Sequence, residues 1–342
     1  MKKFLAILLI IVLMSSIVAC SSATKTPANS GESTKSEDTQ SSVKTTKDKK
    51  VLGVVLFYRR DEFYMDLETK VRLDAEKAGF EVLITDADAD MAKAAAAIED
   101  YTAKGVDAIL CTGSQLLVSS VEAALDKGIP VVCFDGSTPT DKIISNITYD
   151  PIDDGRSVGN WAKKYIEEHW PNETVEIAIL DFPASSEICV GRVNGFKEVI
   201  ATVPNAKIVA QMDGKASRAD SMAAAETILE ANPNIKLAYG INFDTIAGFY
   251  AALEARKKTD TVLCASGSWG EEAIRFLEQD HPQYKAFTLM DPWKMASIGV
   301  QAVVDALEGK KVEQTQAMKA ITYTSETINT LDWKEIIENR IK

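Results

Sequence analysis

Histidine is scarce in this sequence, with only His169 and His281 in 342 residues. The two lie too far apart in sequence to suggest a shared site, which argues against imidazole-based metal or triad chemistry. The sequence also has no phosphate-binding Gly-x-x-x-x-Gly-Lys-Ser/Thr loop and no calcium loop of alternating Asp and Asn with a distal Glu. We therefore expect no cofactor and no metal.

Cysteine is sparse as well, with five residues in the whole chain. Cys111, Cys133 and Cys264 lie in or at the end of apolar runs, where small buried hydrophobic side chains are common. Because the spacing shows no disulfide framework, we expect free thiols. Cys111 and Cys133 are the one pair that adjacent strands could bring together.

Basic residues are outnumbered, at 38 Lys and Arg against 50 Asp and Glu. Residues 1–50 hold eight lysines and four acids, so the remainder carries a net charge of −16. Such an acidic body repels nucleic acids and anionic lipid. The acidic pairs Asp153-Asp154 and Glu271-Glu272 are interpreted as solvated helix starts and not as a glycosidase pair. A secreted hydrolase stays an alternative that ligand turnover would reveal.

The N-terminal segment has the pattern of an export signal. Two lysines precede an apolar run over residues 4–18, which is shorter than the roughly 20 residues of a membrane span. Ile17-Val18-Ala19-Cys20 resembles the lipobox of bacterial lipoproteins, which implies that Cys20 becomes the acylated first residue of the mature chain. Residues 21–50 are rich in Ser, Thr and Lys and are predicted to form a disordered linker.

After residue 50, short apolar runs alternate with amphipathic helical stretches. The continuous apolar run over residues 51–57 indicates a strand buried on both faces. The pattern predicts an α/β fold with two doubly wound lobes, each a parallel sheet covered by helices on both faces. Strands are expected at residues 51–57, 81–85, 107–111, 129–134, 175–180, 206–211, 237–241, 261–265 and 286–289. Helices are expected at residues 65–78, 91–103, 116–126, 187–200, 219–229, 245–255, 271–277 and 295–307.

Polar and aromatic residues follow these predicted strands. Doubly wound sheets bind ligands at the carboxyl ends of their strands, so these residues are the first functional candidates. Strand ends are polar in any α/β fold, but that does not readily explain aromatic side chains beside carboxylates. The segments concerned are residues 58–64, 112–114, 135–137, 242–244, 266–269 and 291–293.

Several segments resemble one known family in order and spacing. They are Asp61-Glu62-Phe63-Tyr64, residues 105–110, residues 128–132 with Asp135, Arg192-Val193-Asn194-Gly195-Phe196, Asn242 and Asp291. From about residue 51 to about residue 329 the chain resembles the type I periplasmic substrate-binding proteins of the ribose and galactose kind, the solute receptors of ABC importers. The resemblance implies a first lobe of residues 51–149 and 292–320 and a second lobe of residues 150–291 and 321–342. A three-stranded hinge would join them near residues 148–151, 290–292 and 320–322.

The resemblance also implies ligand contacts. Aromatic side chains would stack on a sugar, a carboxylate would accept from its hydroxyls, and an arginine and an amide would complete the set. Plain structural roles are the alternative, such as a helix cap for Asn242 or core packing for the tryptophans. At Ser266 the family commonly has an acidic residue, and Trp269 and Trp293 are expected to compensate for an aromatic side chain missing near Ala216. The expected set is Arg59, Asp61, Phe63, Tyr64, Asp135, Arg192, Asn242, Ser266, Trp269, Asp291 and Trp293.

The sequence thus predicts a non-enzymatic, extracytoplasmic receptor, anchored to the lipid bilayer through Cys20 and expected to be a monomer. It would bind a sugar or sugar-like molecule between its lobes and deliver it to an ABC permease with its ATPase. The alternative is a receptor that signals to a chemoreceptor or sensor kinase. The sequence does not separate transport from sensing.

Overall fold

The computed structural model describes residues 49–183, 187–331 and 333–339. All of them belong to one compact unit, Asp48–Lys342. The predicted signal segment with Cys20, and the predicted linker as far as residue 48, lie outside the described residues. Among the described residues, no helix combines the length and apolarity that crossing a membrane requires.

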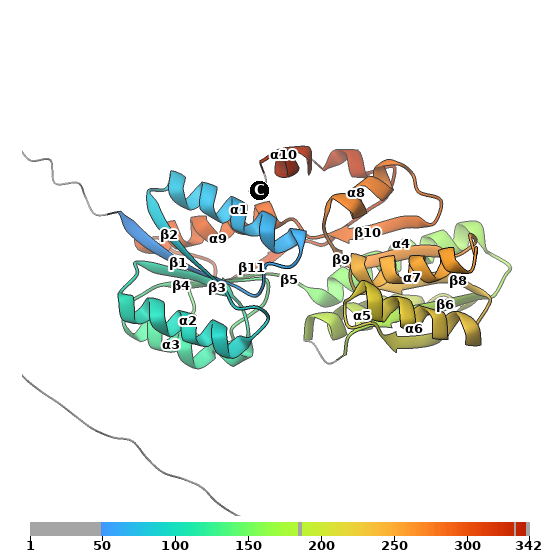
Figure 1. The fold of residues 1–342 in the computed structure, drawn as a ribbon, viewed down its shortest axis with the longest axis horizontal. Helices are drawn as coiled ribbons and strands as arrows, with labels where there is room; N and C mark the ends of the chain where they lie inside the picture. Colours follow the sequence, from blue (N-terminus) through green and yellow to red (C-terminus); the bar gives the residue numbers. More distant parts are fainter. Residues whose placement is uncertain (1–48, 184–186, 332, 340–342) are drawn as a thin grey trace, which may run out of the picture. The chain divides into compact units, whose positions relative to one another are not determined.

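The first lobe is built on a parallel six-stranded sheet with the strand order β11-β5-β4-β3-β1-β2. Two helices cover each face of this sheet (Figure 1), α1 and α9 on one side and α2 and α3 on the other. The strands are β1 (Lys50–Leu56), β2 (Phe80–Asp86), β3 (Ala108–Thr112), β4 (Val131–Phe134), β5 (Ser145–Tyr149) and β11 (Thr315–Met318). The helices are α1 (Glu62–Lys77), α2 (Met91–Lys104), α3 (Val118–Asp126) after the short η1 (Gln115–Leu117), and α9 (Pro292–Leu307).

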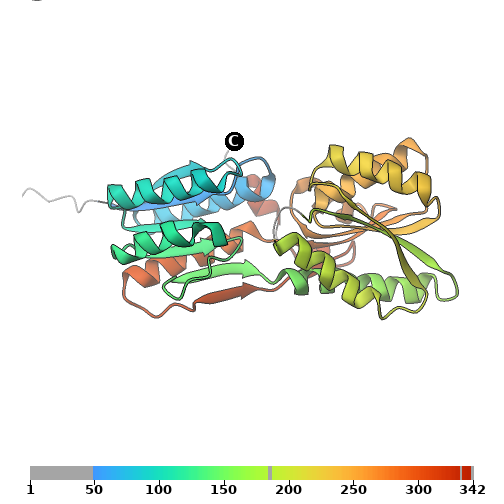
Figure 2. The same ribbon diagram turned by 90° about the horizontal axis from the view of Figure 1, so that it is seen from below.

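The second lobe is built on a sheet with the order β12-β10-β9-β8-β6-β7. Helices α4 and α5 cover one face and α6 and α7 the other (Figure 2). The strands are β6 (Val175–Asp181), β7 (Ala206–Asp213), β8 (Ile235–Gly240), β9 (Val262–Ser268), β10 (Tyr284–Leu289) and β12 (Ile321–Tyr323). The helices are α4 (Pro151–His169), α5 (Glu187–Ile200), α6 (Arg218–Ala231), α7 (Phe243–Ala255), α8 (Glu271–Glu278), the short η2 (Ile328–Thr330) and α10 (Trp333–Glu338).

The predicted fold class, two α/β lobes of doubly wound type, is confirmed. One detail was wrong: β12 runs antiparallel to β10, so the second sheet is not wholly parallel. The pattern analysis also missed β5, α4 and the two short strands β11 and β12. The chain passes from one lobe to the other three times, between β5 and α4, between β10 and α9, and between β11 and β12.

Helix starts at the carboxyl ends of the strands are fixed by side-chain caps. Asp61 precedes α1 and accepts the backbone N–H of Tyr64, so α1 begins at Glu62, three residues earlier than its apolar period predicted. Asn242 caps α7 in a reciprocal capping box with Thr245. Asp291 caps α9 by accepting the N–H of Lys294. Three of the predicted site residues are therefore held in place at helix starts.

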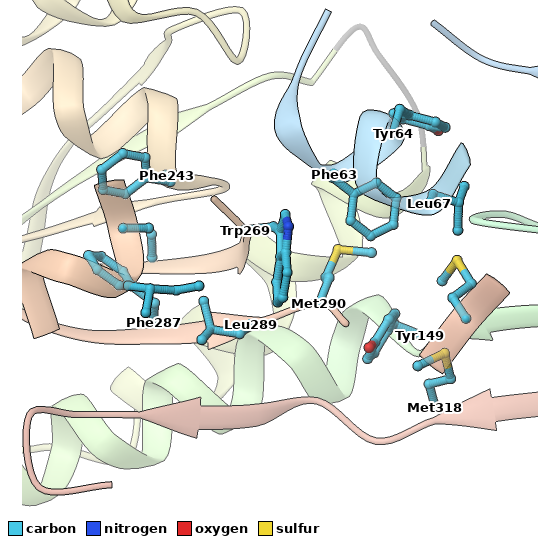
Figure 3. Packing of buried hydrophobic residues seen from close by; sticks show 14 of the residues in the cluster. Phe63, Tyr64, Leu67, Tyr149, Phe243, Trp269, Phe287, Leu289, Met290 and Met318 are labelled. Atoms are coloured by element: carbon cyan, nitrogen blue, oxygen red, sulfur yellow. The ribbon is translucent and has the colours of Figure 1, made fainter. Parts of the chain in front are cut away.

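The apolar core continues from one lobe into the other. Its largest cluster joins the α1 and α9 side of the first lobe to the α6 and α7 side of the second. Between the lobes, Phe63 of α1, Trp269 after β9 and Met290 after β10 point toward one another (Figure 3). The exposed fractions of these side chains are 8% for both Phe63 and Met290 and 9% for Trp269. The lobes are thus joined by packed side chains as well as by the three chain crossings.

Candidate ligand-binding site

In the first lobe, the residues after β1 place a carboxylate among aromatic rings. Asp61 accepts a hydrogen bond from the Tyr58 hydroxyl at 2.8 Å, in addition to the N–H of Tyr64 at 3.0 Å. The rings of Tyr58 and Tyr64 pack with their centroids 4.9 Å apart. Burial raises the pKa of Asp61, and the negative charges of Asp135 and Asp244 raise it further. The two bonds to Asp61 act in the opposite direction.

Asp135 follows β4 and lies beside this cluster. Its backbone has a left-handed φ of 46°, an unusual conformation for a non-glycine residue. The Tyr64 hydroxyl donates a hydrogen bond to the Asp135 carboxylate. Burial raises the pKa of Asp135, whereas this bond and the charge of Arg192 lower it. Arg192 belongs to the second lobe, so one of the charges that affect the pKa of Asp135 comes from the other lobe.

Two glycines allow the loops after β3 and β4 to approach closely. A Cβ atom at Gly136 would collide with the backbone carbonyl of Gly113, and one at Gly113 would collide with the backbone at Gly136. Gly136 also has a φ of 139°, which disfavours other residues. The close approach of Gly113 and Gly136 restrains the backbone next to Asp135, from which its carboxylate extends.

Arg192 of α5 is held by the second lobe itself. Its Nε donates to Asp154 of α4 at 2.7 Å, its Nη1 to the carbonyl of Ile241 at 3.2 Å, and its Nη2 to the sulfur of Met290 at 3.0 Å. The exposed fractions are 7% for Arg192 and 1% for Asp154. The expectation that Asp154 is a solvated helix start was therefore wrong, because it is the buried counter-charge of Arg192.

Close packing of α4 against α5 makes this ion pair possible. A Cβ atom at Gly155 would collide with the carbonyl of Arg192, and one at Gly195 would collide with the carbonyl of Ile152. Glycine at both positions lets the two helix backbones touch, so the short Asp154 side chain reaches the guanidinium. Thr288 of β10 donates to the other oxygen of Asp154.

The remaining predicted residues of the second lobe have different surroundings. Asn242 is half-buried, and its Oδ1 accepts the N–H of Thr245, while its Nδ2 donates to no other residue that the structure describes. Ser266 is fully buried, and its hydroxyl accepts a hydrogen bond from Tyr239 at 2.8 Å. In this structure Ser266 is therefore a core residue, because its buried hydroxyl is already paired with Tyr239.

Trp269 connects the two lobes. Its indole Nε1 donates to Asp66 of α1 at 2.8 Å, and both residues are buried. Two residues after Trp269, at the start of α8, the backbone N–H of Glu271 donates to Glu62 of α1 at 2.8 Å. Both bonds join α1 to the segment after β9, so Trp269 packs within the interface between the lobes.

Three further predicted residues make contacts of other kinds, namely Arg59, Trp293 and Asp291. Arg59 pairs with Glu68, and its guanidinium Nη2 lies 2.7 Å from that carboxylate. The ring of Trp293 lies beside Lys70, whose Nζ is 5.1 Å from the ring centroid. Asp291 caps α9, and its own N–H donates to the Tyr149 hydroxyl at 2.8 Å. None of these contacts assigns a ligand role.

The sequence analysis missed two buried carboxylates whose hydrogen-bond partners are distant in sequence. Asp154 was noticed only as part of an acidic pair, and Asp181 at the end of β6 was not noticed at all. In the described part of the chain, no three His, Cys, Asp or Glu side chains are grouped in a way that could bind a metal ion.

Comparison with known proteins identifies the family. Residues 52–311 match the model of the periplasmic binding protein domain. The chain belongs to this family. Its members are binding proteins, which agrees with the expectation that the chain is not an enzyme.

Several proteins of this family are similar to the chain. The ribose import binding protein of Bacillus subtilis is 24% identical over 266 residues, which cover 77% of this chain and 84% of the relative. The galactofuranose-binding protein of Escherichia coli is 29% identical over 292 residues, covering 80% and 86%. The structure of the periplasmic component of the arabinose ABC transporter from Shewanella sp. ANA-3, bound to L-arabinofuranose, superposes with a TM-score of 0.73 at 20% identity. It covers 85% of this chain and 95% of that one.

Proposed function

We propose that this protein is an exported receptor that binds a sugar or sugar-like molecule between the strand ends of its two lobes and delivers it to an ABC permease. One observation carries the proposal: hydrogen bonds from Trp269 to Asp66 and from Glu271 to Glu62 join α1, which begins beside Asp61 at the strand ends of the first lobe, to the end of β9 in the second lobe. Groups that face each other across two lobes suit a ligand that both lobes contact at once.

The chemistry of the facing groups favours a neutral, hydroxyl-rich ligand. Asp61 and Asp135 supply acceptors, the Nδ2 of Asn242 supplies donors, and Tyr58 and Tyr64 supply ring surface. Hydroxyl groups pair with both kinds of partner, and the apolar faces of a sugar ring pack on aromatic rings. The named ligands of similar proteins, ribose, galactofuranose and arabinofuranose, support the same class.

Binding would be completed by a hinge motion. We place the hinge at residues 148–151, 290–292 and 320–322, as the resemblance implied. The proposal is supported by the chain crossings after β5, after β10 and between β11 and β12. A few residues at the ends of elements absorb such motions in proteins with two lobes.

Membrane anchoring through acylated Cys20 is the second part of the proposal. The lipobox-like sequence at residues 17–20 supports it, and two or more acyl chains hold a protein on a bilayer far better than one. The similar proteins named as import binding proteins favour transport over sensing. Replacing Cys20→Ser should move the protein from the membrane fraction to the soluble fraction, and an unchanged membrane fraction would argue against anchoring at this residue.

Calorimetry against a panel of sugars tests the ligand class. The panel holds D-ribose, L-arabinose, D-galactose, D-allose and myo-inositol. We expect at least one to bind, and we expect Asp135→Ala to weaken that binding by about 10- to 100-fold, the cost of losing a hydrogen bond to a charged group. Asp141→Ala, a change at an exposed aspartate six residues away, is the matched control and should leave binding unchanged. Absence of binding to every member would contradict the proposal.

A further inference from the structure

Strand β6 ends at Asp181, whose two carboxylate oxygens differ in their hydrogen bonding. The exposed fraction of Asp181 is 5%. One oxygen, Oδ2, accepts a hydrogen bond from the side-chain amide of Gln211 on the neighbouring strand β7. The other oxygen, Oδ1, is buried and has no hydrogen-bond partner among residues 49–183, 187–331 and 333–339. Buried polar atoms are almost always paired, so this oxygen needs an explanation.

The position of Asp181 suggests one. It is the last residue of a parallel strand, at the edge of the second sheet where ligands bind in this type of fold. Side chains alternate along a strand, and Ile177 and Ile179 pack on the face covered by α4 and α5. Asp181 is therefore on that same face, at the end where α5 supplies Arg192.

Gln211 gives the carboxylate a fixed direction. Its amide binds Oδ2 and so orients the carboxylate, and Oδ1 receives no hydrogen bond from the residues that the structure describes. Ser266 of β9 is also buried, and its hydroxyl is paired with Tyr239. In the described part of the second lobe, the buried carboxylate oxygen without a hydrogen bond is therefore Oδ1 of Asp181, at the end of β6.

We propose that Asp181 Oδ1 accepts a hydrogen bond from a hydroxyl group of the bound molecule, an inference that rests on the proposed sugar-binding function. Asp181 is then a specificity-determining residue. An acceptor of this kind pairs with a free hydroxyl, rejects an analogue in which that hydroxyl is missing, and repels phosphate or carboxylate groups. The ligand is therefore a neutral sugar or polyol and not a sugar acid or sugar phosphate. Gln211 acts as the positioning residue.

The test measures dissociation constants of the wild type, Asp181→Ala and Asp181→Asn for the panel sugar that binds most tightly and for its mono-deoxy analogues. We expect the wild type to bind one mono-deoxy analogue about 10- to 100-fold more weakly than the parent sugar. In Asp181→Ala that difference should disappear, because the acceptor is gone. The control is Asp213→Ala, since Asp213 is the exposed partner of Asp181 in the strand register and should not affect binding.

The outcomes separate this inference from the proposed function. If the wild type binds every mono-deoxy analogue as tightly as the parent sugar, the proposed role of Asp181 is wrong. This outcome comes from the wild-type measurements alone. Folded Asp181 variants that bind within twofold of the wild type overturn it too, while sugar binding itself stands. A wild type that binds no member of the panel overturns both.

Discussion

The buried pair of Arg192 and Asp154 gives the sharpest stability prediction. Asp154→Asn preserves the shape of the side chain but removes the charge that balances a guanidinium exposed by only 7%. Breaking a buried ion pair by removing one partner costs about 3–5 kcal/mol, because the other charge stays buried. For a domain of this size we expect the melting temperature to fall by roughly 6–20 °C.

The adjacent aspartate provides the control. Asp153 pairs with Arg156 at 2.9 Å, but the exposed fractions of these side chains are 64% and 42%. Exposed ion pairs contribute about 0–1 kcal/mol, so Asp153→Asn should leave the melting temperature almost unchanged. Differential scanning calorimetry of both variants decides the matter. Equal effects of the two substitutions, or a cost below about 1 kcal/mol for Asp154→Asn, would refute the reasoning.

Three further outcomes are expected. Trp269→Phe removes the indole donor to buried Asp66 and should lower the free energy of unfolding in urea by about 1.5–3 kcal/mol, whereas a negligible change would show that the bond does not stabilise the joined lobes. Because burial raises the pKa of Asp135 above the ordinary value of about 4, the folded protein binds this proton more tightly than the unfolded chain. The stability of the wild type relative to Asp135→Asn should therefore fall as the pH rises above about 4, and a constant difference in urea unfolding would contradict this. Cys111 and Cys133 are free thiols with their sulfurs 3.7 Å apart, so alkylation in denaturant followed by peptide mapping should find each singly modified, and a linked peptide would disprove it.

Local patterns in the sequence were sufficient to predict most of the secondary structure. Residues 187–200 were predicted as a helix, and α5 spans that range. The clearest failure is α4, which begins at Pro151 and carries Gly155 and Gly159 in its first half. Glycine lowers helix propensity, so the pattern is weak, and the structural reason for Gly155 is contact with α5. That contact depends on a partner distant in sequence and leaves no local signal.

The candidate site was predicted only in part for the same reason. Strand ends identified Asp61 and Asp135, because a sheet brings its carboxyl ends to one edge whatever the details of packing. Burial of individual side chains depends on tertiary contacts. Ser266 is hidden by Tyr239, and Asp154 and Arg192 are hidden by each other. Only coordinates reveal such pairings.

A crystal structure of the protein with the panel sugar that binds most tightly is the most direct test of the central claim. We expect the sugar to lie between the carboxyl ends of the two sheets, with its hydroxyl oxygens about 2.7–3.2 Å from Asp135 of the first lobe and Asn242 of the second. A sugar held on the outer face of one lobe, touching neither residue, would contradict the account.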